Sequence, residues 1–115
     1  DGDSHMKLSS LALSLSLLAI GQAAHAAPDF AQVKDILTKN ACLACHSVDK
    51  KVVGPAYIDV AAKHKGQADA AEVLTKHIKG GSSGVYGPIP MPPNVGISDA
   101  DIKTVVEWLV AGAPQ

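Results

Sequence analysis

The chain has 115 residues, a formal net charge of −1 at pH 7, ten basic residues that are all lysine, and a hydrophobic content of 47%. A chain of this length allows one domain with a modest core, and such domains are often stabilised by a metal or a cofactor. The near-neutral charge excludes a nucleic-acid-binding protein, which would carry a basic surface. No nucleic-acid partner is therefore expected.

The N-terminal part of the chain is typical of an export signal. Residues 1–5 are interpreted as a cloning remnant ahead of a natural start at Met6. Residues 6–26 combine the charged Lys7, a short apolar stretch and a small–any–small cleavage sequence that ends at Ala26. A retained membrane anchor is the alternative, but a spanning helix needs about 20 apolar residues. We therefore expect cleavage after Ala26, a periplasmic location, no stable membrane insertion, and one domain at 27–115.

Four helices are predicted within this domain. Apolar residues at helical spacing indicate the first helix, and a turn at Gly54-Pro55 precedes the second. The pair Gly80-Gly81 ends the third helix, and an acidic variant of the capping box at Ser98 begins the fourth. The predicted helices are residues 29–40, 56–64, 67–79, and a last helix from 98 that Gly112 ends.

The segment between the last two helices is predicted to be irregular. Residues 84–96 contain four prolines, which remove backbone donors and restrict the chain. No segment shows the alternating pattern of a strand. The expected fold class is therefore all-α, with about four helices around one long proline-rich loop.

The sequence Cys42-Leu43-Ala44-Cys45-His46 is a C-x-x-C-H motif. Residues three apart share one face of a helical turn, so two thiols at this spacing can add to the two vinyl groups of one porphyrin edge. The following histidine can then ligate the iron, and this motif indicates attachment of haem c in an exported protein. The alternatives are a thioredoxin-like redox dithiol, a simple disulfide and half of a zinc site. A thioredoxin fold needs a βαβ unit, which is missing, and zinc needs four ligands, for which no second cysteine pair exists.

Haem iron has a second axial position, for which Met91, His64 and His77 are the candidates. Met91 lies in Pro88-Ile89-Pro90-Met91-Pro92-Pro93, where the prolines stiffen the loop that presents the thioether. A methionine can also simply fill a core. We expect His46 and Met91 to be the iron ligands, and His64, between two lysines, to be exposed to solvent.

Three stretches together resemble the small bacterial class I cytochromes c. They are C-x-x-C-H-S-V-D at residues 42–49, V-G-P-A-Y-x-D-V-A-A-K at 53–63, and G-V-Y-G-P-I-P-M-P-P-N at 84–94. The last stretch is similar to the cytochrome c-551/c-552 group. The resemblance implies a small all-α cytochrome c fold around one covalently bound haem, His/Met ligation, and electron transfer between periplasmic respiratory proteins.

The resemblance also implies roles for four further residues. The Pro55 carbonyl would accept the proton on His46 Nδ1, and the Asn94 amide would donate to the Met91 sulfur, although Asn94 could equally be a turn residue. Tyr86, where many relatives have Trp, would lie near a haem propionate. His77, where many relatives have Arg, would lie near the same propionate.

A haem with ligands on both faces has no open position for a substrate. We therefore expect a monomeric one-electron carrier and no enzyme. The alternatives are a haem-bearing docking subunit of a larger complex, and a haem peroxidase or gas sensor with a labile Met ligand. Expected partners are redox proteins such as nitrite reductase, a terminal oxidase or a cytochrome bc1-type donor. We expect an apolar docking patch of Val52, Val53, Pro55, Ala56, Ile89 and Pro92, rimmed by Lys50, Lys51, Lys63 and Lys79.

Overall fold

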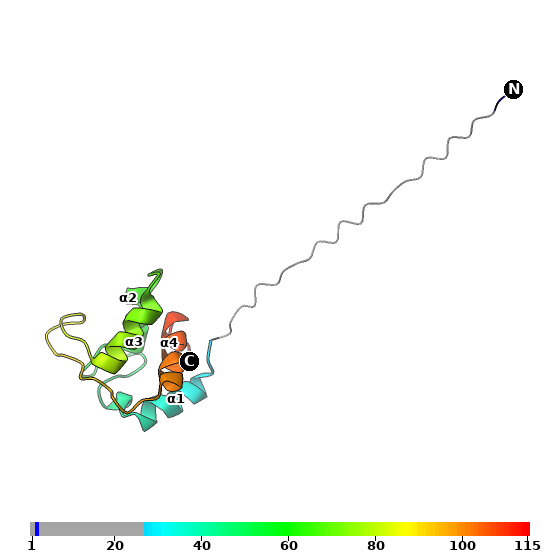
Figure 1. Ribbon diagram of the computed structural model, residues 1–115. Coiled ribbons are helices and arrows are strands. Elements are labelled where there is room, and N and C mark those ends of the chain that lie inside the picture. The colour runs from blue at the N-terminus through cyan, green and yellow to red at the C-terminus, as the bar shows by residue number, and fades with distance from the viewer. Residues whose placement is uncertain (1, 3–26) are drawn as a thin grey trace.

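The computed structural model describes residue 2 and residues 27–115. The described domain is helical, with α-helices α1 (Phe30–Lys39), α2 (Tyr57–His64), α3 (Ala70–Gly80) and α4 (Asp99–Val110) and a short 3₁₀ helix η1 (Cys42–Ala44) (Figure 1). No strand is assigned within these residues, which agrees with the predicted all-α fold. The predicted signal segment and most of the cloning remnant lie outside the described residues.

The residues that flank helix α1 cap both of its ends with side-chain hydrogen bonds to the helix backbone. The Asp29 carboxylate accepts a hydrogen bond from Ala31 N at 3.2 Å, which is a typical N-cap. At the other end, the Asn40 amide donates to Ile36 O at 2.8 Å. The buried face of the helix consists of Val33, Ile36 and Leu37. The predicted helix at 29–40 is thus confirmed to within one residue at each end.

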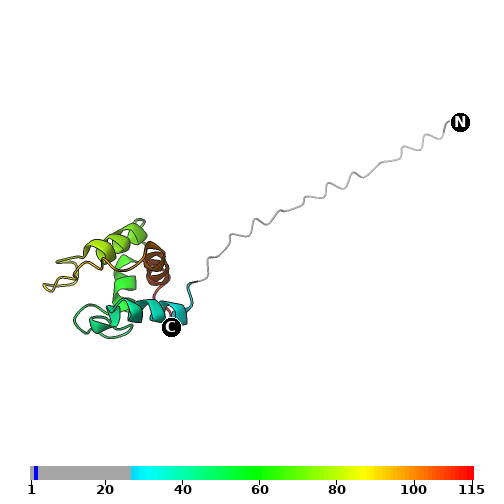
Figure 2. The same cartoon turned by 60° about the horizontal axis from the view of Figure 1, so that its bottom comes forward.

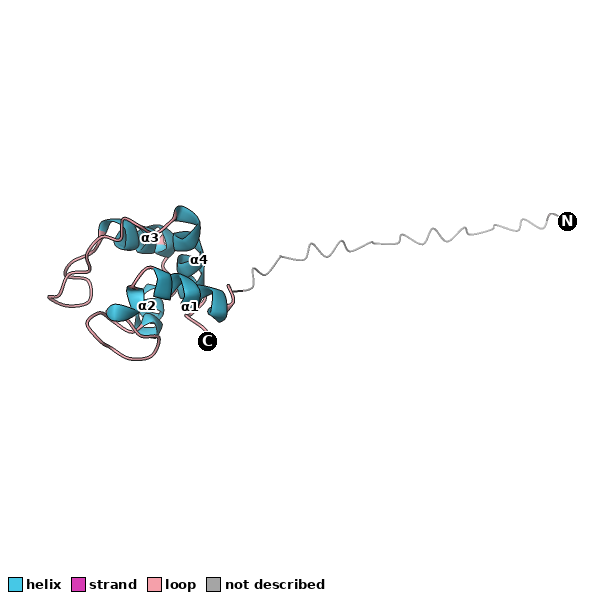
Figure 3. Ribbon diagram, turned by 90° about the horizontal axis from the view of Figure 1, so that it is seen from below, coloured by secondary structure: helices cyan, strands magenta, loops and turns pink. Residues whose placement is uncertain are grey.

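Helix α4 contacts each of the other three α-helices, α1, α2 and α3. Figure 2 shows it along one side of the domain, and Figure 3 shows it beside α3 and α1. The Ser98 hydroxyl accepts from Asp101 N at 3.1 Å and caps the helix, as the capping box predicts. The Trp108 ring is fully buried and lies 5.9 Å from the Phe30 ring, centroid to centroid, where α1 crosses α4. Trp108 thus belongs to the core, and the partly buried Phe30 packs against it.

Helix α3 begins three residues later than predicted. Gly66 has φ +76°, a left-handed conformation that breaks the helical path after α2. Gln67 N then bonds back to His64 O at 3.1 Å, so residue 67 belongs to a turn and not to a helix. At its far end α3 includes Gly80, and Gly81 leaves the helix at φ +77°. Residues 65–69 contain no large apolar side chain, so apolar spacing does not locate the first residue of this helix.

Two long connections leave the helices on the same side of the domain. One runs from η1 to α2 and the other, rich in proline, runs from α3 to α4. Both line a common cavity. Within the part of the chain that the structure describes, no helix has the length and apolar content that crossing a membrane requires.

Candidate functional site

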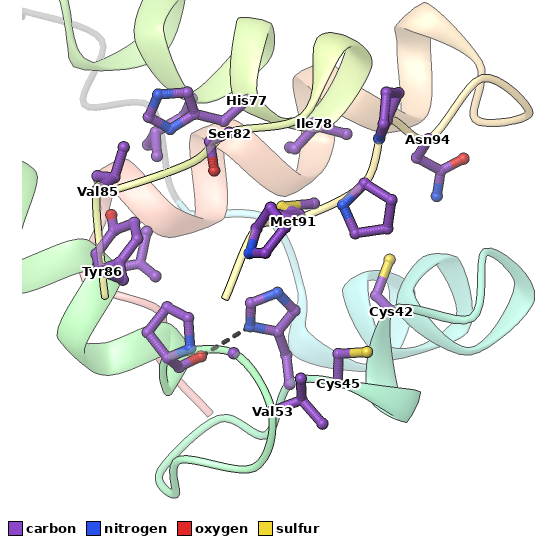
Figure 4. A pocket seen from close by; sticks show the side chains of 18 of the residues that line it. Cys42, Cys45, Val53, His77, Ile78, Ser82, Val85, Tyr86, Met91 and Asn94 are labelled. Atoms are coloured by element: carbon purple, nitrogen blue, oxygen red, sulfur yellow. Dashed lines mark hydrogen bonds between the residues drawn. The ribbon is translucent and has the colours of Figure 1, made fainter. Parts of the chain in front are cut away.

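The two connections and the inner faces of the helices enclose a cavity of about 450 Å³. Its walls are mainly aliphatic, with Leu37, Val60, Leu74, Val105 and Leu109 on the helix side. The residues that the sequence singled out also line it: Cys42, Cys45, His46, Pro55, His77, Tyr86, Met91 and Asn94. These eight residues, from Cys42 to Asn94, span 52 positions of the sequence and meet at one apolar cavity (Figure 4).

Cys42 and Cys45 lie at one edge of this cavity. Residues 42–44 form the 3₁₀ turn η1, and His46 N continues it by donating to Cys42 O at 3.0 Å. This local turn puts the two cysteines near each other, and Figure 4 shows both sulfur atoms on the same side of the site. Both thiols are free and half-buried. Burial raises the pKa of the Cys42 thiol above its ordinary value.

The imidazole of His46 is held in one orientation by three neighbours. Its Nδ1 lies 2.7 Å from the carbonyl oxygen of Pro55, the contact that Figure 4 marks with a dashed line. Its ring stacks on Tyr57 with 4.9 Å between centroids and 23° between planes. A Cβ atom at Gly54 would lie only 2.5 Å from His46 Cε1, so the backbone of the 54–55 turn packs directly against the ring.

The contact with Pro55 determines which nitrogen of His46 carries hydrogen. A carbonyl oxygen can only accept, so Nδ1 must be the donor. In the neutral ring, Nε2 is then the unprotonated nitrogen, and its lone pair is available to a metal ion. The ring is therefore prepared as a ligand by the same turn that packs against it.

Met91 is held by its backbone. Met91 N donates to Ser82 O at 2.8 Å and Ser82 N donates to Met91 O at 3.1 Å, which closes residues 82–91 into a loop with a narrow neck. Gly81 lies against this neck, where a Cβ would approach Met91 O to 2.6 Å. Figure 4 shows the Met91 side chain in the cavity between the α3 residues and the cysteines. The pairing and the neighbouring prolines restrict where its thioether can lie.

Asn94 has the contacts of a turn residue. Its amide donates to Asn40 O at 3.2 Å, and its side-chain oxygen accepts from Gly96 N and Ile97 N, both at 3.2 Å. Its backbone N donates to Ile78 O at 2.9 Å. These bonds connect the proline-rich loop to the end of α1 and to α3. A hydrogen bond from the second amide hydrogen to the Met91 sulfur stays a prediction.

His64 is not exposed, and this part of the prediction is wrong. The side chain is buried, and both of its ring nitrogens have hydrogen-bond partners inside the domain. Nδ1 lies 2.7 Å from Gln67 Oε1, and Nε2 lies 2.8 Å from Tyr86 OH. The flanking Lys63 and Lys65 are exposed and suggested a solvated segment, but α2 turns position 64 inward. Tyr86 therefore has a protein partner for its hydroxyl that the sequence did not indicate.

His77 lies beside this pair, half-buried and with its ring 6.2 Å from the His64 ring. Burial lowers the pKa of His77 below its ordinary value, and the positive charge that His64 can carry lowers it further. Burial raises the pKa of Tyr86 to about 12, so its phenol stays protonated near neutral pH. The His64 ring thus lies near both, 6.2 Å from the His77 ring and 6.3 Å from the Tyr86 ring. A haem propionate beside His77 and Tyr86 stays a prediction.

Sequence reasoning missed four residues that shape the site: Gly54, Tyr57, His64 and Gly81. Gly54 was assigned only to a turn and Gly81 only to a helix end, although glycine beside the functional Pro55 and ten residues before Met91 was a signal of close backbone approach. The spacing of His64 and Gln67 was a weak sign of a local side-chain bond. Nothing in the sequence indicated that Tyr57 stacks on His46.

The residues present fit a covalently attached haem. Two free thiols lie at the edge of an apolar cavity, an imidazole with an available Nε2 enters it, and a thioether lies within it. This is the donor set of a His/Met cytochrome c. A zinc site does not fit, because no three His, Cys, Asp or Glu side chains among the described residues gather as metal ligands.

Comparison with known proteins gives the same family. Residues 30–112 match the Cytochrome c family. The chain is 58% identical to cytochrome c-552 of Nitrosomonas europaea over 76 residues, 66% of this chain and 74% of that protein. It is 51% identical to cytochrome c-551 of Pseudomonas aeruginosa over 98 residues, 84% of this chain and 92% of that protein.

Solved structures agree with the sequence comparison. The crystal structure of wild-type Nitrosomonas europaea cytochrome c552 matches with a TM-score of 0.66 at 56% identity, covering 69% of this chain and 98% of that one. The class 1 cytochrome MtoD from Sideroxydans lithotrophicus matches with a TM-score of 0.62 at 31% identity, covering 74% and 97% of the two chains. The chain therefore belongs to the cytochrome c family, as a bacterial class I member of the cytochrome c-551/c-552 group, and is an electron carrier with covalently bound haem c.

Proposed function

We propose that this cytochrome carries single electrons between respiratory proteins of the periplasm, with its haem attached through Cys42 and Cys45 and its iron ligated by His46 and Met91. The bound haem supplies the one-electron couple. The protein residues hold the ligands in place, exclude water and present the haem edge to partners.

The observation that carries this proposal is the restraint on the two axial ligands. Pro55 fixes the His46 tautomer with a 2.7 Å contact, and Ser82 pairs with both backbone groups of Met91. Ligands that hardly move between oxidation states keep the reorganisation on electron transfer small. Hydrogen bonds to a metal ligand orient it and tune the metal that it binds.

Two further features favour a carrier over an enzyme. Ligands on both faces leave no open coordination position, which catalytic metal sites generally keep. A methionine ligand and an apolar cavity also favour reduced iron, because the additional positive charge of oxidised iron is poorly solvated there. A peroxidase or a gas sensor would need Met91 to leave the iron, and the paired neck at Ser82 opposes such a movement.

The docking patch is smaller than the one expected from the sequence. Val52, Val53 and Ile89 are exposed to 54%, 46% and 62%, although they are large apolar residues. Ala56, the N-cap residue of α2, is only 1% exposed, so we omit it from the patch. Lys50, Lys51 and Lys63 are exposed. Lys79 instead forms an ion pair with Asp99 at 2.6 Å, so we omit it from the basic rim.

The chemistry of this patch indicates what kind of partner surface we expect. A redox partner would present a small apolar face with acidic residues around it, since rim charges mainly steer encounter. Nitrite reductase, a terminal oxidase and a cytochrome bc1-type donor are the partners that we propose. We also propose that the chain is monomeric and reaches the periplasm through cleavage of residues 6–26.

The ligand set is tested with spectra of the exported holoprotein. We expect a pyridine spectrum of haem with two thioether links, and a sulfur-to-iron charge-transfer band in the oxidised protein. Cys42→Ala and Cys45→Ala should each leave at most one link, and Met91→Ala should remove the band. Val110→Ala, at an α4 side chain that is 58% exposed and does not line the cavity, is the matched control and should leave both spectra unchanged.

Each negative outcome has a definite meaning. A two-link spectrum in either cysteine variant would contradict the attachment sites, and a high-spin oxidised spectrum in the wild type would favour the enzyme. The mass of the exported protein tests cleavage after Ala26. A retained N-terminal segment would favour a fixed docking subunit instead of a mobile carrier.

A further inference from the structure

Four side chains beside the cavity form one continuous hydrogen-bonded chain, which we call the His64 chain: Asp69, Gln67, His64 and Tyr86. Gln67 Nε2 donates to Asp69 Oδ1 at 2.9 Å. Gln67 Oε1 lies 2.7 Å from His64 Nδ1, and His64 Nε2 lies 2.8 Å from Tyr86 OH. The chain starts at the exposed Asp69 and ends at the half-buried Tyr86, which lines the cavity.

The first two members determine where the hydrogen lies on His64. A carboxylate only accepts, so the Gln67 amide must turn its NH₂ group to Asp69 and its oxygen to His64. The reversed amide would put two acceptor oxygens together at the Asp69 contact. Gln67 Oε1 can only accept, and therefore His64 Nδ1 carries a hydrogen whether the ring is neutral or charged.

The remaining nitrogen then controls the hydroxyl of Tyr86. When His64 is neutral, Nε2 has a bare lone pair and the Tyr86 hydroxyl must donate to it. When His64 is protonated, Nε2–H is the donor and the Tyr86 oxygen must accept. The hydrogen of Tyr86 is then free for another acceptor, since the phenol, whose pKa burial raises to about 12, keeps its proton throughout.

We propose that His64 is a positioning residue for Tyr86: protonation of His64 releases the Tyr86 hydroxyl from the ring and allows it to donate to a haem propionate, which makes the reduction potential depend on pH. This inference rests on the proposed function. A hydrogen bond to a propionate offsets part of its negative charge, and less negative charge near the iron favours the reduced, less positive state. The potential is therefore lower with a neutral His64, at high pH, than with a protonated His64, at low pH.

Other titratable and charged groups also face His64 and Tyr86. His77, on α3, faces His64 with 6.2 Å between ring centroids. Lys63, on α2, places Nζ 5.4 Å from the centroid of the Tyr86 ring. The Asp69 carboxylate is the charged group at the outer end of the chain.

The first test reads the hydrogen position directly. In ¹⁵N-labelled holoprotein above the histidine titration, one- and two-bond ¹H–¹⁵N correlations distinguish the two neutral tautomers of His64. We expect Nδ1 to be the protonated nitrogen. Gln67→Leu removes the acceptor and should shift His64 toward the other tautomer. A neutral wild-type His64 with its hydrogen on Nε2 would overturn the proposal without any variant having to fold.

The second test follows the reduction potential against pH in four holoproteins: wild type, His64→Gln, Tyr86→Phe and the double variant. Each single variant should lose part of the pH dependence. The double variant should lose no more than His64→Gln does, because Tyr86 responds to pH only through His64. If Tyr86→Phe keeps the full pH dependence, His64 acts as a charge alone and the proposal fails.

A matched control separates charge from positioning. Lys63→Gln removes a positive charge beside Tyr86 and leaves every bond of the His64 chain in place, so it should move the pH midpoint and keep the size of the change. All samples are checked first for two thioether links and the sulfur-to-iron band. Loss of those spectra in the wild type would refute the proposed ligand set, whereas normal spectra with an unexpected His64 result would refute this inference only.

Discussion

The close packing of Gly54 on His46 leads to a quantitative prediction. In Gly54→Ala, the added Cβ would lie 2.5 Å from Cε1, 3.0 Å from Nδ1 and 3.1 Å from Nε2 of the same imidazole. Three ring atoms are therefore too close at once, so no small rotation of the ring relieves all of the contacts. The ring or the 54–55 turn must shift, and either movement disturbs the 2.7 Å contact between His46 and Pro55.

The expected cost follows from these contacts. Inserting a methyl group into a closely packed region destabilises a protein by about 1–3 kcal/mol. For a domain of this size, each kcal/mol corresponds to a change in Tm of roughly 4–8 °C. We therefore expect a lower Tm for Gly54→Ala, together with a changed reduction potential, because the ring that ligates the iron is displaced.

Gly80→Ala is the matched control. It makes the same chemical change, but no atom lies within 4 Å of the added Cβ and the residue is the last of helix α3. Alanine in a helix is more stable than glycine by about 0.5–1 kcal/mol, so this variant should have an equal or higher Tm and an unchanged potential. Thermal unfolding and potentiometric titration of both holoproteins measure the difference. Equal Tm and potential in the two variants would refute the packing argument.

Three further predictions concern the rest of the site. Gly81→Ala places a Cβ 2.6 Å from Met91 O at a residue with φ +77°, so the sulfur-to-iron band should weaken; an unchanged band would show that the neck is not needed. His77→Gln should reduce the fall of the midpoint potential between about pH 5 and 8, around the ordinary histidine pKa, because oxidised iron disfavours a proton on His77. Burial and the nearby His64 already lower the pKa of His77. The same pH slope as in the wild type would exclude His77 from the redox-linked site. The double variant Lys50→Gln, Lys51→Gln should slow electron transfer to an acidic partner at low salt and hardly at high salt, measured by stopped flow; equal rates at low salt would refute the basic rim.

The helices and the attachment motif could be predicted because their determinants are local. Asp29 and Ser98 cap the helices that follow them, and the C-x-x-C-H spacing acts within one turn. Met91 was identified through its prolines and the family resemblance, although its partner Ser82 was not. His64 was predicted wrongly because its burial depends on Tyr86, 22 residues away. Its immediate neighbours are lysines, and local polarity does not show which side of a short helix faces inward.

The contact between Gly54 and His46 also could not be predicted from the neighbouring sequence. A glycine next to a proline is a normal turn sequence, and nothing in it shows that the backbone will lie against an imidazole eight residues earlier. Contacts between a turn and a side chain depend on how the whole connection folds back. They become visible only when the atoms are placed in space.

The neck between Ser82 and Met91 has a consequence for how this loop can change in evolution. The two mutual hydrogen bonds tie the ends of the segment together, so the length of the intervening stretch has little influence on the position of Met91. Insertions or deletions near Gly84, where no atom lies within 4 Å of an added Cβ, would alter the outer surface and the reach of Tyr86. The sulfur position would be conserved through such changes. Lineages could therefore diversify partner choice and pH response in this stretch while inheriting the same coordination.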